Sequence, residues 1–482
     1  MSIVEQIFKF GESKPDKIAF LNGKVSLTYE NMLKGILFAK NKLQKEYGLV
    51  KGDKVILAAD KQMEFIFVYF ACHLLEIVTL PIAPDTNAKR YELIKNKVCP
   101  KLVVGFLDED TNIITAELKD FLGYVDVVDI SQISFPNMDS IADIIFTTGT
   151  TGMPKGVQLS HRNIMAAARN INTFIGNKSE DVEMIALPIS HSFGLGRMRC
   201  VLSNGQTLVM LGSFVNVKRF FRFIEEYGVN GFGMVPASWA LLKKMSGNTI
   251  ANFSNQLHYI EIGSAPMPLE EKNNLINLLP NTRICMHYGL TEASRSAFME
   301  FHEEKKYLNT VGKQSPNMYI TIRNELGEEL VCGEEGEICV SGDAVTVGYL
   351  DLPKEENFWG DSFRTGDWGT KDENGYISLK SRKKELINVG GKKVSPIEVE
   401  EVLMEIDFIE DCVCVATTDP EGILGEVVKA FIVTSEPLKV KLEYIDGLIG
   451  SKLENYKHPA IYEIIDEVPK TASGKIQRLS LK

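Results

Sequence analysis

Short apolar runs alternate with longer amphipathic stretches along the first hundred residues. Residues 54–58, 77–81 and 102–104 are short and rich in Val, Ile and Leu, as buried strands are. Residues 29–47 carry apolar side chains at helical spacing. Strands that alternate with helices in this way are typical of βαβ units, so the pattern predicts a largely parallel sheet.

One apolar stretch, residues 65–83, has the length of a membrane-spanning helix. His73, Glu76 and Pro81 interrupt it, and ionisable groups are costly inside a bilayer. We therefore expect a buried helix followed by a strand, and no membrane span. Residues 1–17 mix acidic and basic side chains without an apolar centre, which is not the pattern of a signal peptide.

A loop rich in hydroxyl groups and glycine follows the apolar run at residues 141–146. Its residues are Thr147, Thr148, Gly149, Thr150, Thr151, Gly152, Met153, Pro154, Lys155 and Gly156. Glycines let backbone N–H groups approach an anion, and the hydroxyls and the Lys155 ammonium add donors, so the loop predicts a phosphate-binding site. A flexible surface turn is the alternative. A Walker A loop is excluded, because Lys155 lies between Pro154 and Gly156.

Other candidate positions lie where predicted elements begin or end. Ser160 has the side chain of a helix N-cap, and we expect a helix through residues 162–165 to begin close to the phosphate loop. Residues 235–239 and 263–267 both end apolar, strand-like runs. The carboxyl ends of parallel strands are where α/β sheets bind ligands, so these two segments are candidate binding positions.

Composition narrows the classes of function. A chain of 482 residues with 44% apolar residues can form two or more domains. The net charge of −11 argues against nucleic acid as the main partner. The eight cysteines show no metal-binding spacing, and we interpret them as buried free thiols in a reducing compartment, the cytoplasm. Cys412 and Cys414 are two residues apart, which places both on one face of a strand.

Basic residues accumulate abruptly at residues 379–388, between a strand-like run and a new hydrophobic pattern. Such a change is typical of a domain junction and predicts a large domain of residues 1–383 and a small one of residues 384–482. In the small domain a helical stretch at residues 397–404 precedes strand-like runs at 412–416 and 429–434. The small domain is therefore expected to have an α+β fold.

Several segments, in order along the chain, are similar to the signature motifs of the acyl-adenylate-forming superfamily. They are the loop that begins at Thr147 and residues 187–196, 263–267, 287–292, 336–349, 363–369, 379–388, 390–400 and 469–478. This superfamily includes acyl-CoA synthetases, peptide-synthetase adenylation domains and firefly luciferase, and the chain most resembles a stand-alone acyl-CoA or acyl-carrier-protein synthetase. One departure is Ser381, where the family pattern usually has Gly.

The resemblance implies an α/β fold. A large N-terminal domain would contain parallel-rich sheets with helices plus a β subdomain. A small, mobile α+β C-terminal domain would follow, with its hinge at Lys384.

The resemblance also implies a set of site residues. The implied cofactor-binding residues are Thr147, Thr148, Gly149, Thr150, Thr151, Gly152, Lys155, Gly263, Ser264, Ala265, Pro266, His287, Tyr288, Gly289, Asp367, Arg382, Gly390 and Gly391. The implied catalytic residues are His191, Thr291, Glu292 and Lys475, and the implied metal ligands are Thr147 and Glu292.

Individual roles follow from the motif positions. Tyr288 would stack on adenine, Asp367 would bind the ribose hydroxyls, and Arg382 would contact ribose or phosphate. Thr291 would contact phosphate, Glu292 would hold Mg2+ and His191 would line the carboxylate pocket. The loop with Gly390 and Gly391 would enter the site for the second half-reaction, and Lys475 would act in the first.

The implied reaction joins a small carboxylic acid to ATP with Mg2+, forming an acyl-adenylate and pyrophosphate. The acyl group then passes to the pantetheine thiol of coenzyme A or of an acyl carrier protein. Amino-acid-activating relatives usually carry an Asp in the second motif, and residues 188–191 contain no acid, which favours a fatty, aryl or other non-α-amino acid.

A stand-alone amino-acid adenylation enzyme that loads a carrier protein is the alternative. A luciferase-like oxygenase and a catalytically silent binding protein are further alternatives, and the silent protein is disfavoured because Glu292, Asp367 and Lys475 are present. Arg197 and Arg199, which follow the second motif, could meet a second substrate carboxylate or a carrier's phosphate, or could form structural ion pairs.

Overall fold

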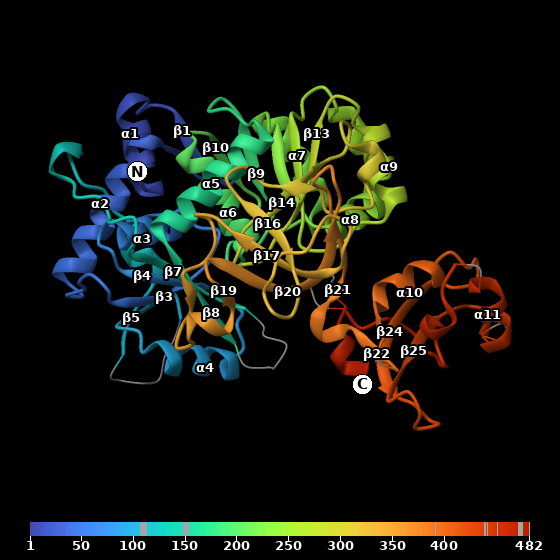
Figure 1. Cartoon of the computed structure of the whole chain (residues 1–482). Helices are drawn as coiled ribbons and strands as arrows, with labels where there is room; N and C mark the ends of the chain where they lie inside the picture. The colour runs from blue at the N-terminus through green and yellow to red at the C-terminus, as the bar shows by residue number, and fades with distance from the viewer. Residues whose placement is uncertain are drawn as a thin grey trace. The chain divides into compact units, whose positions relative to one another are not determined.

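The computed structural model describes residues 1–106, 113–147, 154–390, 392–437, 440, 442–450, 452–470 and 476–481. Figure 1 shows the helices and strands of the chain, coloured from the N-terminus to the C-terminus. By its internal contacts the chain forms two compact units. The first contains Met1–Ile320 and Val340–Phe363, and the second contains Thr321–Cys339 and Arg364–Lys482. The domain boundary predicted between residues 383 and 384 stays a prediction.

A seven-stranded sheet in the first unit carries the predicted phosphate loop. Its order is β18-β8-β7-β4-β3-β5-β6. The strands are β3 (Lys54–Ala58), β4 (Val78–Ile82), β5 (Leu102–Val104), β6 (Ile114–Ala116), β7 (Ile141–Thr147), β8 (Lys155–Ser160) and β18 (Gly348–Tyr349). The pairs among β3 to β7 are parallel, whereas β8 is antiparallel to both β7 and β18. The predicted strands at residues 54–58, 77–81 and 102–104 are thus confirmed, and so is their parallel arrangement.

A nine-stranded sheet forms the rest of the framework, in the order β15-β14-β13-β12-β11-β9-β10-β1-β2. Its strands are β1 (Ile18–Leu21), β2 (Ser26–Thr28), β9 (Val182–Ile185), β10 (Thr207–Met210), β11 (Gly231–Met234), β12 (Tyr259–Ile262), β13 (Arg283–Tyr288), β14 (Ala297–Glu300) and β15 (Lys313–Gln314). The six strands from β1 to β13 along the sheet are parallel, and β2, β14 and β15 are antiparallel additions at its edges.

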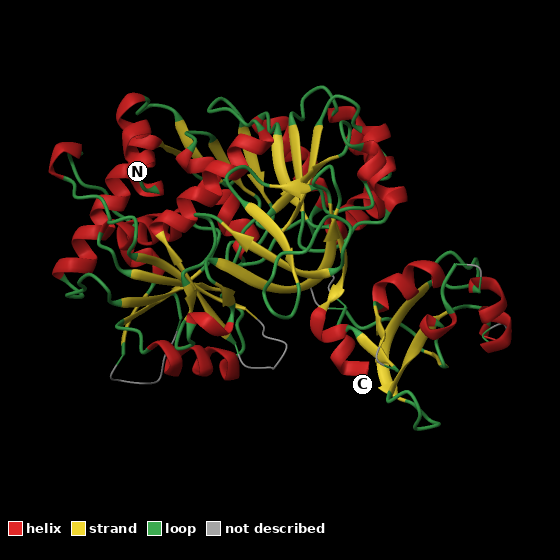
Figure 2. Cartoon of the chain, viewed as in Figure 1, coloured by secondary structure: helices red, strands yellow, loops and turns green. Residues whose placement is uncertain are grey.

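Helices lie on either side of the strands of these two sheets (Figure 2). They are α1 (Ile3–Ser13), α2 (Tyr29–Lys45), α3 (Met63–Leu74), α4 (Ala88–Val98), α5 (His161–Ile175), α6 (Ser192–Ser203), α7 (Val217–Tyr227), α8 (Pro236–Ser246) and α9 (Leu269–Leu278). Every residue of α3 is buried, which explains its apolar composition and confirms the predicted buried helix followed by a strand. Within the described part of the chain, no helix has both the length and the apolar character needed to cross a bilayer.

The remaining strands form a β subdomain and the C-terminal fold. A five-stranded sheet has the order β16-β17-β20-β19, with β21 paired to β20. Its strands are β16 (Tyr319–Arg323), β17 (Gly336–Ser341), β19 (Phe358–Trp359), β20 (Ser362–Lys371) and β21 (Ile377–Arg382). The C-terminal elements are β22 (Ile387–Val389), β23 (Lys392–Val394), α10 (Pro396–Leu403), β24 (Asp411–Thr418), β25 (Glu426–Val433), α11 (Leu442–Ile449) and β26 (Ile461–Ile464). On β24, Cys412 and Cys414 pack into one hydrophobic cluster, whereas Val413 and Val415 pack into another, so the predicted common face of the two cysteines is confirmed.

Two expectations are corrected. Cys99 and Cys332 are exposed, so only six of the eight free thiols are buried, because these two lie on loops at the surface. The helix capped by Ser160 does form, as α5, but it does not begin close to the phosphate loop. The intervening residues form β8, in which Lys155 pairs with Thr147 and Ser160 pairs with Ile141. At about 3.4 Å per strand residue, the start of α5 lies about 17 Å from Lys155 along β8.

Candidate active site

The carboxyl ends of four neighbouring parallel strands bring the predicted site segments of the first unit to one edge of the nine-stranded sheet. Their order is β9, β11, β12 and β13, and register pairs Met234 with Ile262 and Ile262 with Met286. The segments after these strand ends contain His191, Gly263 and Thr291. Parallel strands place their carboxyl ends together, so residues up to a hundred apart in sequence become neighbours at one edge.

His191 lies at the N-cap of α6, with an exposed side chain. Its N–H donates to the carbonyl of Pro188 at 3.3 Å, and its own carbonyl accepts from Leu195 at 3.0 Å. The backbone of Gly194 packs tightly against that of Pro188, because a Cβ placed on Gly194 would lie 2.3 Å from the Pro188 carbonyl oxygen. Only glycine fits there, so the packing of Gly194 sets where α6 starts and where His191 is presented.

Gly263 and His287 face each other on the neighbouring strand ends of β12 and β13. A Cβ on Gly263 would lie 2.1 Å from the His287 ring, so the imidazole occupies the space that a side chain would need. Ser264 follows with a φ of 73°, in the left-handed region, and both Ser264 and Pro266 are exposed. Tyr288, the last residue of β13, is half-buried beside them. The backbone at Ser264 and Pro266 is therefore accessible to solvent, and the aromatic ring of Tyr288 lies at the neighbouring strand end.

A group of buried charges lies directly under this edge. The Glu261 carboxylate contacts His287 Nδ1 at 2.7 Å, Arg295 Nε at 3.0 Å and Arg197 Nη1 at 3.3 Å. Arg197 also pairs with Glu183 through two of its nitrogens. Burial alone would raise the pKa of Glu261, but the Arg295 guanidinium, His287 and Arg197 outweigh burial and hold this pKa below its usual range. Burial lowers the pKa of His287, and Glu261 only partly opposes that effect.

Arg199 belongs to a second buried group. Its Nε donates to the Tyr69 hydroxyl at 2.8 Å, and its Nη2 pairs with the carboxylate of Asp143. The same carboxylate contacts His73 at 3.3 Å and accepts from Thr79. Of the two interpretations of Arg197 and Arg199, the structure therefore supports structural ion pairs.

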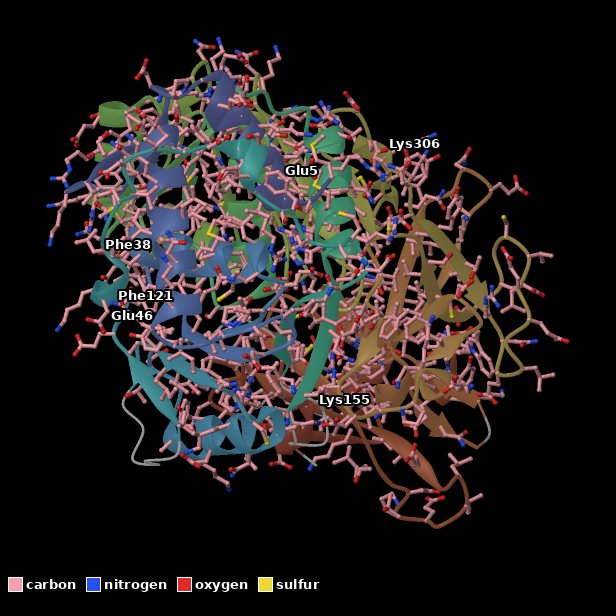
Figure 3. The ribbon with its side chains drawn as sticks, turned by 90° about the vertical axis from the view of Figure 1, so that its left-hand side faces the viewer. Glu5, Phe38, Glu46, Phe121, Lys155 and Lys306 are labelled. Atoms are coloured by element: carbon pink, nitrogen blue, oxygen red, sulfur yellow. The ribbon has the colours of Figure 1, made fainter. Side chains whose placement is uncertain are left out.

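Lys155 and Tyr349, from the seven-stranded sheet, lie next to Glu292, which follows β13 of the nine-stranded sheet. Lys155 is the first residue of β8, at one end of the strand (Figure 3), and its ammonium lies 4.8 Å from the centre of the Tyr349 ring. The Tyr349 hydroxyl donates to Glu292 Oε1 at 2.6 Å. Thr291 precedes Glu292, and its hydroxyl donates to the Ser192 hydroxyl at 3.3 Å, next to His191.

The residues around Glu292 could hold a Mg2+ ion whose other ligands come mainly from a bound nucleotide. No group of three or more His, Cys, Asp or Glu residues that could hold a metal occurs in the described part of the chain. Mg2+ usually keeps several waters and binds one or two carboxylates together with substrate phosphates. Glu292 uses one oxygen for Tyr349, which leaves the other for a cation. Thr147, the other predicted ligand, ends β7 opposite Lys155 and is half-buried.

A small cavity between α5 and α6 adjoins this site. Its lining residues are Leu159, Asn163, Ile164, Ala167, Ala168, Ile171, Ser192, Gly196, Arg199, Thr291, Ser294 and Ala344. The α6 residues among them recur at spacings of four and three, so they share one face of the helix. None of the lining residues is Asp or Glu, so the cavity offers no counter-ion to an ammonium group.

Among the described residues, three predicted site residues belong to the second unit. Asp367 and Arg382 are paired across β20 and β21, and Arg382 Nε lies 2.8 Å from Asp367 Oδ1. Asp367 is buried, whereas Arg382 is more than one-third exposed. Gly390 lies after β22 with a φ of 57°, in the left-handed region that favours glycine. The structure thus brings Asp367 and Arg382 into direct contact.

Some predicted residues lie outside the described ranges. They are Thr148, Gly149, Thr150, Thr151, Gly152, Gly391 and Lys475. On either side of Lys475, Lys470 and Ile476 form an antiparallel bridge, and the Gln477 N–H donates to the Pro469 carbonyl at 2.9 Å. The proposed roles of the seven residues outside the described ranges rest on the sequence alone.

The sequence missed three residues that organise this edge: Tyr349, Glu261 and Arg295. A signal for Glu261 was available, because a carboxylate in the middle of the apolar run at residues 259–262 must be buried with a partner. Tyr349 lies in the motif at residues 336–349, for which the resemblance implies no site residue. Its contact with Glu292 depends on the pairing of β18 with β8, which no local pattern reveals.

Comparison with known proteins agrees with this geometry. The model of the AMP-binding enzyme family matches residues 7–350, and the model of the AMP-binding enzyme C-terminal domain matches residues 398–475. The chain therefore belongs to the AMP-binding enzyme family, and the predicted acyl-adenylate-forming superfamily is confirmed.

Three relatives illustrate the range of the family. The 2-succinylbenzoate–CoA ligase of Staphylococcus epidermidis is 29% identical over 480 residues, which cover 98% of this chain and 96% of the relative. The long-chain-fatty-acid–CoA ligase of Bacillus subtilis is 31% identical over 76% of this chain and 66% of its own. The 4-coumarate–CoA ligase-like 6 of Arabidopsis thaliana is 29% identical over 76% of this chain and 65% of its own. The chain thus spans slightly less than two thirds of the last two relatives.

Solved structures show the same fold. The o-succinylbenzoate coenzyme A synthetase of Bacillus subtilis, in complex with ATP and magnesium ion, has a TM-score of 0.86 at 23% identity. The alignment covers 99% of this chain and 98% of the Bacillus subtilis chain. ATP-bound MatB from Rhodopseudomonas palustris has a TM-score of 0.88 at 22% identity and covers 100% of this chain and 98% of its own. The predicted fold class is confirmed.

Proposed function

We propose that this protein is an AMP-forming acid–thiol ligase. It joins a carboxylic acid to the α-phosphate of ATP and releases pyrophosphate, and a pantetheine thiol then attacks the acyl carbon and displaces AMP. The observation that carries the proposal is the meeting of His191, Gly263, Tyr288 and Thr291 at one sheet edge, in a chain that belongs to the AMP-binding enzyme family. The related CoA ligases support coenzyme A as the acceptor, and a carrier protein is the other acceptor considered.

The first unit binds the base, the acid and the phosphates. Tyr288 stacks on adenine, and the segment of Gly263, Ser264, Ala265 and Pro266 runs along it, with His287 and Gly289 next to them. His191 lines the pocket for the reacting carboxylate. The exposed position of Ser264 and Pro266 and the half-buried Tyr288 ring support this arrangement, because they leave one strand end accessible to a flat ligand.

The phosphates would contact Thr291 and the loop from Thr147 to Lys155. Glu292 would hold Mg2+, with Thr147 as a second ligand, and bound Mg2+ would neutralise charge on the phosphates. Lys155 adds a positive charge that binds ATP in the ground state. The distance of 4.8 Å between the Lys155 ammonium and the Tyr349 ring supports a common site for the lysine and Glu292.

The second unit supplies the remaining contacts. Asp367 binds the ribose hydroxyls and Arg382 contacts ribose or phosphate, which their direct pairing supports. Lys475 supplies the positive charge for adenylation, and the backbone at Gly390 and Gly391 approaches the pantetheine arm in the second half-reaction.

We propose residues 384–482 as a mobile lid that rotates about Lys384 between the half-reactions. The hydrophobic cluster of the C-terminal fold supports this boundary, because it begins at Ile387. The match to the C-terminal family model, which begins at residue 398, agrees with it. A cytoplasmic location is also proposed, supported by the eight free thiols.

The acid is proposed to be fatty, aryl or another non-α-amino acid. The cavity next to Ser192 and Thr291 supports this choice, because an α-amino acid carries an ammonium group that would need a carboxylate partner. A stand-alone amino-acid adenylation enzyme remains the second candidate on the sequence resemblance.

The test is a screen for pyrophosphate release. The protein is incubated with ATP, Mg2+ and a panel of carboxylic and α-amino acids, with coenzyme A or a phosphopantetheinylated carrier protein. We expect acid-dependent pyrophosphate with a non-amino acid, and an acyl thioester when the right thiol is added. Amino-acid-dependent pyrophosphate exchange would favour the second candidate, and no acid-dependent release from any acid would contradict both.

Matched variants connect the screen to the site. Glu292→Gln should abolish most pyrophosphate release, since it removes the proposed metal ligand. Glu303→Gln is the control, because Glu303 is an exposed carboxylate of the same unit that pairs with Arg283 at 3.3 Å.

A further inference from the structure

Tyr349 and the segment that leads to it hold Glu292 at two points. The Tyr349 hydroxyl donates to Glu292 Oε1 at 2.6 Å, and the two residues are only 9% and 8% exposed. The Thr346 N–H donates to the Glu292 backbone carbonyl at 2.7 Å, and Val345 forms an antiparallel bridge with Ala293. Backbone and carboxylate of Glu292 are therefore fixed by the same short segment, residues 345–349.

Tyr349 itself is fixed by strand pairing. In β18 it lies opposite Val157 of β8, and the Leu350 N–H donates to the Gly156 carbonyl at 2.7 Å. Lys155 is two residues from Val157 and so shares its face of the strand. Diagonal neighbours across antiparallel strands are within reach of long side chains, which places the Lys155 ammonium 4.8 Å from the centre of the Tyr349 ring.

The two ends of the Tyr349 side chain therefore contact two different charged groups. The hydroxyl contacts the acid, and the ring contacts the lysine. An aromatic ring attracts an ammonium through its quadrupole without neutralising it. Within the described part of the chain, Lys155 forms no ion pair with a carboxylate, so its charge and that of Glu292 are both kept for a ligand.

We propose that Tyr349 is a positioning residue for the metal and phosphate site. Its hydroxyl occupies one oxygen of Glu292 and leaves the other to hold the Mg2+ that would accompany ATP. Its ring holds Lys155 beside that position. This inference rests on the proposed role of Glu292 as a metal ligand. Hydrogen-bond partners of metal ligands typically change metal affinity by about 10- to 100-fold when they are removed.

The two contacts can be separated by mutation. Tyr349→Phe removes the hydroxyl and keeps the ring, whereas Tyr349→Leu removes both. Tyr47→Phe is the matched control, because it deletes a phenol hydroxyl from a ring that stacks on Phe121, in the same unit but away from these residues. Binding of Mn2+, as a probe for Mg2+, is measured by electron paramagnetic resonance in the presence of α,β-methylene-ATP.

We expect Tyr349→Phe to weaken Mn2+ binding by about 10- to 100-fold. The affinity for the nucleotide without metal should stay at the wild-type value in Tyr349→Phe. It should fall in Tyr349→Leu, and Lys155→Met should show the same fall. Pyrophosphate release by Tyr349→Phe should recover at high Mg2+ concentration, which a general loss of structure would not allow. Tyr47→Phe should bind Mn2+ as the wild type does.

Two results would overturn the inference in different ways. Unchanged Mn2+ affinity in folded Tyr349→Phe, together with lost affinity in Glu292→Gln, removes the role of Tyr349 and leaves the proposed function intact. Unchanged Mn2+ affinity in Glu292→Gln removes the proposed metal ligand itself, and the inference with it.

Discussion

The buried carboxylates Asp143, Glu183 and Glu261 are compensated by arginine partners, whereas His161 is, among the described residues, a buried ionisable residue without a compensating partner. It is fully buried at the start of α5, and within the described residues neither of its ring nitrogens has a hydrogen-bond partner. The ring of His73 lies 5.0 Å away, and Asp143 and Arg199 complete the surrounding charges. Burial lowers the pKa of His161 to about 3, with His73 and Arg199 adding to the effect.

This burial predicts a pH-dependent stability. The folded pKa of His161 lies below the unfolded value of 6.5, so the unfolded chain takes up the proton first and stability falls as pH falls below 6.5. Between pH 7 and pH 5 the loss should be about 2 kcal/mol. His161→Leu cannot take up this proton, so its urea-unfolding free energy should change less over the same range. Equal pH slopes for the two proteins would refute this assignment.

A second prediction at this scale concerns Lys475. A unit charge about 4 Å from an oxyanion contributes about 4 kcal/mol at an effective dielectric constant of about 20, which is about three decades of rate. Lys475→Ala should lose that much of the adenylation rate, whereas transfer from a preformed acyl-adenylate to the thiol should persist. Rapid-mixing measurements of each half-reaction test this.

The control for Lys475→Ala is Lys452→Ala, which removes an exposed lysine that pairs with Glu405. It should leave both half-reactions unchanged. Equal losses in both half-reactions of Lys475→Ala would show that Lys475 does not act specifically in adenylation.

At the scale of elements, the first turn of α6 depends on Gly194. A Cβ there would lie 2.3 Å from the Pro188 carbonyl oxygen, which is backbone and cannot rotate away. Gly194→Ala should therefore displace the turn that carries His191. We expect a loss of about 1–3 kcal/mol in unfolding free energy and a lower kcat/KM for the acid.

Gly447→Ala is the matched control, because Gly447 is a helical glycine in α11 with no neighbour within 4 Å of its Cβ position. It should keep or slightly raise stability, since alanine favours helices. If Gly194→Ala keeps the wild-type unfolding free energy and kcat/KM, the turn accommodates the extra methyl group and the prediction is wrong.

Elements also show the limit of local sequence patterns. The strand at residues 141–147 and the capped helix after Ser160 were both predictable, because apolar runs and cap residues act locally. The strand β8 between them was not predicted, and so the start of α5 was expected close to the phosphate loop. Glycine and lysine at residues 155–156 have weak strand propensity, and only the partners β7 and β18 stabilise them there.

At the scale of the whole molecule, the proposed rotation of the lid requires freedom at Lys384. The residue is exposed in a short 3-10 turn at residues 383–385. Lys384→Pro fixes φ near −65° and restricts the preceding residue, so it should hold the lid in one state and slow at least one half-reaction. Lys384→Ala, which keeps the backbone free, is the control. If Lys384→Pro runs both half-reactions at the wild-type rate, the hinge lies elsewhere.

The sequence by itself determined the family, the fold class and the order of the motifs. Segments such as residues 287–292 and 363–369 could be assigned because they are local and contiguous. The tertiary structure alone decided which charges are compensated: Arg197 and Arg199 are buried with Glu183, Glu261 and Asp143. It alone also placed Tyr349 between Lys155 and Glu292. The physical reason is that hydrogen bonds and ion pairs depend on distance in space, and strand pairing brings together residues whose separation in sequence carries no signal.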